Sequence, residues 1–209
     1  DRKPERSSLK YLTGLKPEKK NEGFLTPAKV QYVARSGNFK EKGFDYTGAL
    51  RVLKVIMSYE YLWTNIRVKG GAYGCSGSFG RNGDSNFVSF RDPHLRGTNQ
   101  VYEGIPAYLE QFTVEERDMT KYVIGTIGEM DTPLNPAALG RRSMNAWICG
   151  LTEERIQQER DQVLSASQED IRRLAPFMQA VLDQNCICVL GNEEKLKAES
   201  DLFMKLEEF

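Results

Sequence analysis

Arg67 and Tyr73 are the two residues whose types and spacing best suit recognition of a peptide. The intervening Val-Lys-Gly-Gly-Ala contains the pair Gly70-Gly71, which breaks the chain and folds it back, so that both side chains could face one cleft. A guanidinium offers planar donors to a carbonyl or carboxylate, and a phenol offers one more. The pair could therefore clamp a peptide carbonyl or stabilise an oxyanion, with Gly70 and Gly71 as the supporting loop. A surface arginine next to a tyrosine at the edge of the core is the commoner arrangement, and spacing alone leaves both open.

Glycine recurs at every third position around this pair, at Gly71, Gly74, Gly77, Gly80 and Gly83. A dinucleotide fingerprint requires two glycines separated by a single residue before a helix, and a Walker loop requires Gly-Lys-Ser/Thr; the sequence offers neither. Glycines in a strand leave its backbone bare, so something lies close to it. That neighbour is either an internal element or an extended peptide, and the spacing does not decide between them.

A catalytic metal site is not expected in this chain. The only histidine is His94, whereas both zinc motifs with a glutamate require two imidazoles one helical turn apart. The four cysteines, Cys75, Cys149, Cys186 and Cys188, form no closely spaced zinc-binding pairs. We interpret them as reduced thiols, which fits a bacterial cytoplasm or an organelle matrix.

The elements that must position Arg67 and Tyr73 follow from periodicity and turn residues. The pattern predicts a strand at 30–35, a helix at 46–62 starting from Asp45, and a hairpin of strands 72–80 and 86–91 around Asn82-Gly83. A run of helices follows, with starts at Thr113, Asn135, Thr152 and Ser167. The chain then ends in a strand at 186–190 and an amphipathic helix with Leu196, Phe203 and Leu206. This order predicts an α+β two-layer sandwich whose mixed, mostly antiparallel sheet has helices packed on one face.

Composition is that of a globular chain. It has 209 residues, of which 29 are Lys or Arg and 29 are Asp or Glu, so the net charge is zero. Such a balance disfavours nucleic-acid binding, and no apolar stretch approaches the roughly 20 residues of a membrane helix. Residues 1–28 are basic, contain Pro4, Pro17 and Pro27, and are predicted to be a linker or lead-in; 29–209 is predicted to be a single domain. Because the chain opens on Asp1, we expect it to be a fragment of a longer protein.

Several motifs resemble the C-terminal part of the insulinase/pitrilysin superfamily, in particular its presequence-protease branch. They are Arg67-Val-Lys-Gly-Gly-Ala-Tyr-Gly74, the preceding Glu60-Tyr-Leu-Trp-Thr-Asn-Ile66, Ser89-Phe-Arg-Asp-Pro93, Phe44-Asp-Tyr-Thr-Gly-Ala-Leu50, Ile124-Gly-Thr-Ile-Gly-Glu129 and Gly150-Leu-Thr-Glu-Glu154. The resemblance covers about residues 22–194. It implies a metallopeptidase fold of the LuxS/MPP type. It also implies that a missing N-terminal half binds zinc, while this half supplies Arg67 and Tyr73 to hold an unstructured peptide.

The resemblance leaves three functions open. The chain is either the substrate-binding half of a zinc peptidase, inactive alone, or a structural subunit of the same fold, or a stand-alone peptide-binding module. The presence of both Arg67 and Tyr73 favours the first. The expected partners are the zinc-bearing half and an unstructured peptide, with homo-association through the exposed interface between halves as a further possibility.

Overall fold

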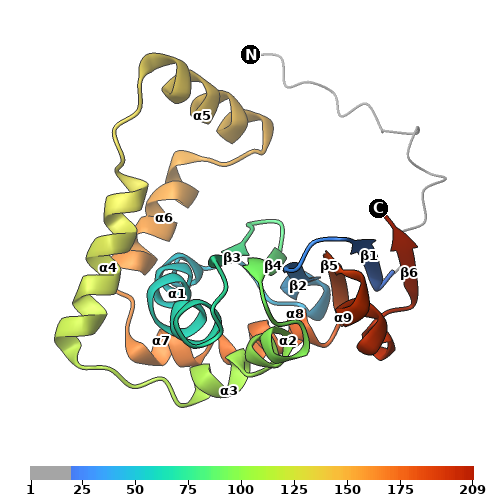
Figure 1. The fold of residues 1–209 in the computed structure, drawn as a ribbon. Coiled ribbons are helices and arrows are strands. Elements are labelled where there is room, and N and C mark those ends of the chain that lie inside the picture. Colours follow the sequence, from blue (N-terminus) through green and yellow to red (C-terminus); the bar gives the residue numbers. More distant parts are fainter. Residues whose placement is uncertain (1–19) are drawn as a thin grey trace.

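The computed structural model describes residues 20–209, which form a six-stranded sheet and a layer of helices (Figure 1). The strand order is β3-β4-β2-β5-β1-β6. The first four strands in this order pair antiparallel, whereas β1 runs parallel to both β5 and β6. The strands are β1 Glu22–Thr26, β2 Gln31–Asn38, β3 Gly74–Phe79, β4 Asp84–Asp92, β5 Cys186–Asn192 and β6 Lys205–Glu208. The predicted α+β class and mixed sheet are confirmed.

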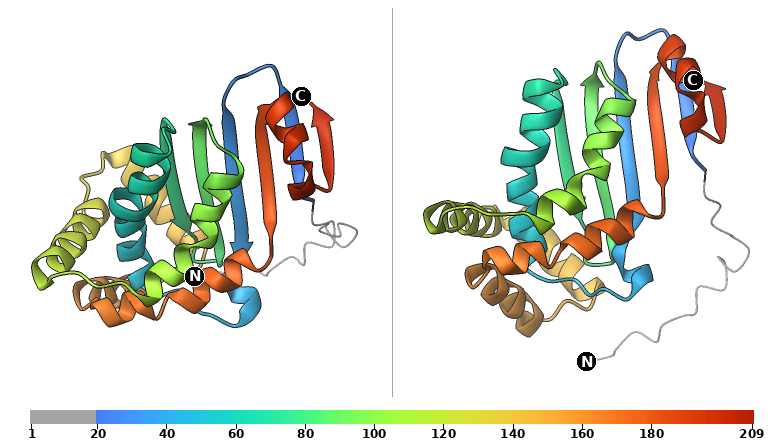
Figure 2. Two further views of the ribbon diagram at one scale, coloured as in Figure 1. Left: turned by 60° about the horizontal axis from the view of Figure 1, so that its bottom comes forward. Right: turned by 90° about the horizontal axis from the view of Figure 1, so that it is seen from below.

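The helices gather on one side of the sheet, as Figure 2 shows from two directions. They are α1 Ala49–Ile56, α2 Arg96–Glu103, α3 Ile105–Glu110, α4 Glu116–Met130, α5 Pro136–Ile148, α6 Glu153–Leu164, α7 Gln168–Arg172, α8 Ala175–Leu182 and α9 Glu193–Ala198. Two π-helical segments, η3 Met57–Tyr61 and η4 Trp63–Lys69, continue α1, and two short 3-10 turns are η2 Phe39–Lys42 and η5 Ser200–Leu202. Within residues 20–209, none of the helices is both long and apolar enough to span a membrane.

The core lies between the sheet and the helices. Strand side chains alternate between two faces, so Val33, Phe87 and Val189 are buried under the helices, while Tyr32 and Phe90 lie on the open face and are 42% and 41% exposed. The predicted strand around residue 32 is confirmed and extends to Asn38. The predicted hairpin is also confirmed, with β3 and β4 pairing in one continuous register.

One boundary from the sequence is wrong. Residues 22–26, assigned to the linker, form β1 in the interior of the sheet, between β5 and β6. The remainder of that assignment, over residues 1–19, lies outside the described part of the chain. The basic composition around β1 hid a short strand whose partners are more than 160 residues away.

Two predicted helix starts are also wrong, because side chains from distant elements compete for the backbone. Asp45 does not cap α1; the helix begins at Ala49, since the Gln162 amide oxygen accepts the Gly48 amide proton at 2.7 Å. Thr113 does not cap α4, because Gln168 holds the Val114 backbone extended through bonds of 3.1 and 2.7 Å. The expected last helix likewise ends at Ala198, and Leu206 belongs to β6, where it packs over Gly23.

Helix starts set by adjacent residues are confirmed. The side chains of Asn135, Thr152 and Ser167 accept backbone protons at the starts of α5, α6 and α7. Ser167 and Asp170 complete a reciprocal capping box. These caps need no tertiary contact, and this is why the sequence alone located them.

Candidate functional site

The turn between η4 and β3 carries the two predicted binding residues. Arg67 lies in the last turn of η4, and Tyr73 directly precedes β3. Gly71 adopts φ +76°, and its amide donates to the Arg67 carbonyl at 3.0 Å; the next amide, of Ala72, donates to Ile66 at 3.1 Å. These bonds pair two carbonyl groups at the end of the helix, and the chain then reverses direction and enters β3 at the edge of the sheet.

The two predicted glycines of this turn are required for different reasons. A Cβ at Gly70 would lie 2.5 Å from the carbonyl oxygen of Ile66, so a side chain there would collide with backbone. A Cβ at Gly71 would have room, but its positive φ is costly for other residues. The supporting loop predicted from the sequence therefore depends on one glycine for space and on the other for conformation.

Arg67 and Tyr73 each pack on their own neighbour. The Arg67 guanidinium carbon lies 4.7 Å from the centroid of the Trp63 ring, one helical turn earlier. The Tyr73 ring is 62% exposed and lies 5.4 Å from the ring of Phe90 on β4. Both polar ends are therefore supported by aromatic surface and accessible to a ligand.

Arg91 joins this site, and sequence reasoning missed it as a binding candidate. Its guanidinium carbon lies 5.6 Å from the Tyr73 ring centroid, and its carbonyl accepts the Tyr73 amide at 3.3 Å. Arg91 has φ +49°, a left-handed conformation that is uncommon for residues other than glycine. The pairing of β2 with β4 shifts register at this point, which marks a bulge. The Ser-Phe-Arg-Asp-Pro motif placed Arg91 near the site, but its conformation depends on strand pairing.

The charge at this end of the sheet is positive. Among residues 20–209, neither Arg67 nor Arg91 has a carboxylate within ion-pair distance. The nearby Asp92 is fully buried, and its carboxylate accepts hydrogen bonds from the amide of His94 at 2.8 Å and from the hydroxyl of Thr98 at 2.7 Å. Burial, together with the negative charge of Asp92, raises the pKa of the Cys75 thiol to about 11, although the positive charge of Arg67 acts in the opposite direction. Arg91 and the exposed phenol of Tyr73 lie together, and their donors suit a carbonyl or carboxylate ligand, whereas Arg67 packs on Trp63 at the other side of the turn.

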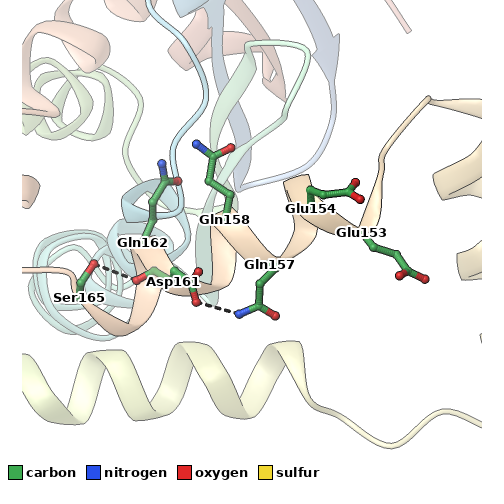
Figure 3. Close-up of a pocket in the computed structure, with 7 residues that line it drawn as sticks. All are labelled: Glu153, Glu154, Gln157, Gln158, Asp161, Gln162 and Ser165. Atoms are coloured by element: carbon green, nitrogen blue, oxygen red, sulfur yellow. Dashed lines mark hydrogen bonds between the residues drawn. The ribbon is translucent and has the colours of Figure 1, made fainter.

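A separate hollow of the surface lies elsewhere, on α6 (Figure 3). Its lining residues come from this helix and the residue that follows it: Glu153, Glu154, Gln157, Gln158, Asp161, Gln162 and Ser165. Bonds within the helix hold some of them, such as the Gln157 amide donating to Asp161 Oδ1 at 2.7 Å. The hollow is acidic and open, so we interpret it as a solvated helix face.

No step of metal chemistry can be assigned to this part of the chain. Across residues 20–209, histidine, cysteine, aspartate and glutamate side chains form no group of three that could hold a metal ion. His94 follows β4 in the loop before α2, as expected. The residues present therefore do not fit the zinc site of a peptidase.

Comparison with known proteins assigns the family. Residues 21–192 match the model described as the PreP C-terminal domain, which is most of the chain. The chain belongs to the PreP C-terminal domain family. The superfamily resemblance inferred from the motifs is thereby confirmed.

Individual relatives of this PreP C-terminal domain include a protein named as a presequence protease. Protein HypA of Clostridium perfringens is 45% identical over 185 residues, covering 88% of this chain and 19% of the relative. Presequence protease 1, chloroplastic/mitochondrial, of Arabidopsis thaliana is 32% identical over 183 residues, covering 87% of this chain and 17% of the relative. The PreP C-terminal domain thus spans about a fifth of the length of these two relatives.

Solved structures show the same fold at low identity. The peptidase M16 inactive domain from Pseudomonas fluorescens superposes with a TM-score of 0.60 at 14% identity, covering 85% of this PreP C-terminal domain and 45% of that chain. This similarity supports the two-layer architecture alone.

Proposed function

We propose that this chain is the non-catalytic C-terminal half of a zinc-dependent peptidase that degrades unstructured peptides. Arg67 and Tyr73 bind the peptide next to the bond that is cut, Gly70 and Gly71 shape their loop, and the sheet contributes to the chamber wall. Zinc is held by the N-terminal half, the principal partner. The compartment is a bacterial cytoplasm or an organelle matrix.

The observation that carries this proposal is the cationic and aromatic turn at the edge of the sheet. Arg67 and Tyr73 flank one glycine turn, both are supported by rings, and Arg67 lacks an ion-pair partner in the described part of the chain. Family membership and the peptidase names of relatives supply the reaction class. Arg91 over the Tyr73 ring adds a second guanidinium beside the same ligand.

The proposal is tested by kinetics of the longer polypeptide, or of this chain mixed with the zinc-bearing half, on an unstructured fluorogenic peptide. We expect Arg67→Ala to lower kcat/KM about 10- to 100-fold, because a charge-assisted hydrogen bond contributes about 1.5–3 kcal/mol. Tyr73→Phe should lower kcat/KM about 2- to 10-fold, because a neutral hydrogen bond contributes about 0.5–1.5 kcal/mol. Arg117→Ala, which removes an exposed guanidinium from α4, is the matched control and should leave turnover unchanged.

Two results would favour the other functions. Unchanged kcat/KM in both site variants would favour a purely structural subunit of the same fold. Calorimetry of this chain alone with the same peptide tests the stand-alone binding module, and the absence of heat from micromolar to millimolar peptide would exclude it. Hydrolysis by the chain alone would contradict the proposed location of the zinc.

A further inference from the structure

Helix α5 stands apart from the rest of the described chain. Figure 1 shows it at the far end of the helical layer, connected to α4 and α6 by extended segments. None of its thirteen residues is buried. Its apolar side chains are among the most exposed of the molecule, with Trp147 at 70% and Ile148 at 65%.

These apolar side chains form one stripe. At 100° per residue, Leu139, Met144, Trp147 and Ile148 occupy one half of the helix circumference, which also includes the small polar Ser143. Arg141, Asn145 and Arg142 occupy the other half. An amphipathic helix of this kind ordinarily buries its apolar half against a partner. Within residues 20–209, the stripe of α5 remains largely uncovered, with exposed fractions from 53% at Leu139 and Met144 to 70% at Trp147.

Local signals nevertheless specify α5 as a helix at both ends. Asn135 accepts the Ala138 amide proton at 2.9 Å, and Pro136 follows at the first helical position. At the other end Gly150 has φ +64°. The amides of Gly150 and Leu151 donate to the carbonyls of Trp147 at 3.1 Å and Ala146 at 2.8 Å. This is a Schellman motif. Helices this short are marginal in water without packing, so both caps preserve a helix that lacks its tertiary support.

Gly140 adds a second and independent feature of the stripe. It lies between Leu139 and Met144 on the apolar half, has no positive φ, and has no atom within 4 Å of a Cβ position. Glycine weakens a helix relative to alanine, and nothing in the described chain requires it here. A notch in an apolar stripe allows a partner element to approach the helix backbone closely.

We propose that the apolar stripe of α5 docks onto the remainder of the longer polypeptide, with Gly140 at the closest approach. This rests on the proposed function as one part of a longer peptidase. The chain covers 19% and 17% of two relatives, so most of their length is available to supply the counter-surface. Because α5 carries Arg141 and Arg142 and no carboxylate, the counter-surface has an apolar centre with acidic residues at its rim.

Hydrogen–deuterium exchange of the α5 amides tests this directly. In the 209-residue chain alone we expect exchange within seconds at every protein concentration. In the longer polypeptide we expect the same amides to exchange at least 100-fold more slowly. Equal exchange in both proteins would overturn the proposal, and protection that grows with the concentration of the chain alone would assign the stripe to a second copy instead.

Matched variants on the two halves of the same helix locate the contact. Trp147→Glu should remove the protection in the longer polypeptide, whereas Asn145→Glu should retain it. Gly140→Leu should slow amide exchange in the chain alone, because leucine favours the helix more than glycine does. In the longer polypeptide it should speed exchange, because the leucine side chain would fill the notch and prevent close approach of the partner. Equal effects of Trp147→Glu and Asn145→Glu would exclude docking through the stripe. Peptide cleavage with Arg67→Ala is measured separately, so failure of docking and failure of the proposed function remain distinguishable.

Discussion

Arg81 and Glu159 form a two-point ion pair that fastens the turn of the β3–β4 hairpin to helix α6. Arg81 Nε donates to Glu159 Oε1 at 2.7 Å, and Nη2 donates to Oε2 at 2.6 Å. The Glu159 side chain is 2% exposed, and Arg51 lies 3.5 Å from the same carboxylate. The pair therefore fixes the hairpin against the helical layer, and this hairpin carries Tyr73 and Arg91.

Arg81→Ala is expected to destabilise the chain by about 2 kcal/mol in urea unfolding. Removing one partner of a fully buried pair costs roughly 3–5 kcal/mol. The smaller figure reflects the 40% exposure of Arg81 and the two arginines that remain at the Glu159 carboxylate, Arg51 at 3.5 Å and Arg155 at 3.8 Å. Arg160→Ala is the control, because the Arg160–Asp131 pair has the same two-point geometry at 2.6 and 2.7 Å but is exposed to solvent, so its loss should destabilise the chain much less than the loss of Arg81. Equal losses would show that burial of Glu159 is unimportant.

Arg91→Gly should stabilise the chain by about 0.5–1 kcal/mol. A left-handed conformation costs a residue with a side chain about 1–2 kcal/mol, and glycine avoids this cost. Glycine also loses more conformational entropy on folding, which offsets about 0.5–1 kcal/mol of that gain. Asn185, at φ +47°, is the comparison, since asparagine tolerates this region and Asn185→Gly should be nearly neutral. A loss of stability in Arg91→Gly, measured by urea unfolding, would indicate that the side chain is held for packing.

Gly71→Ala should cost about 1–2 kcal/mol, because its φ of +76° is strained for alanine although space is available. Gly128→Ala, within α4, is the matched substitution: its Cβ would also meet open space, but the backbone is helical. It should stabilise by up to about 1 kcal/mol. Thermal unfolding of the two variants should therefore shift in opposite directions, and a shared direction would contradict this account.

Thiol reactivity should separate the cysteines. With a pKa raised to about 11, Cys75 should resist iodoacetamide at pH 8 in the folded chain, whereas the exposed Cys149 should react. Mass spectrometry of the alkylated peptides measures the order. Modification of Cys75 before Cys149 would contradict the burial of the Cys75 thiol.

The same shift predicts lower stability in alkali. The folded chain keeps the Cys75 proton to about pH 11, whereas the unfolded chain releases it near the ordinary value of 9.0. The unfolded state therefore binds fewer protons in this window, and the free energy of unfolding falls as pH rises from about 9 to 11. Cys75→Ala should reduce the slope of the urea midpoint against pH over this range. An unaltered slope would assign the effect to tyrosines such as the half-buried Tyr108, whose pKa partial burial raises to about 12.

The sequence by itself determined the features that arise between neighbouring residues. The caps of Asn135, Thr152 and Ser167 and the Asn82-Gly83 hairpin use hydrogen bonds and dihedral angles within a few positions of the chain. The motif around Arg67 and Tyr73 gave the family, which comparison confirmed. The binding role of these two residues remains a prediction.

Only the tertiary structure decided what depends on partners far along the chain. β1 is a strand because β5 and β6 return to its sides, and α4 begins late because Gln168 competes for the backbone of Val114. Arg91 lies beside Tyr73 because β3 pairs with β4, and its left-handed backbone coincides with the bulge in the pairing of β4 with β2. The periodicity of apolar residues indicates which side chains can be buried, whereas contacts between distant parts of the chain decide which of them are buried. Helix α5 is the example, because its sequence has an apolar stripe but none of its residues is buried.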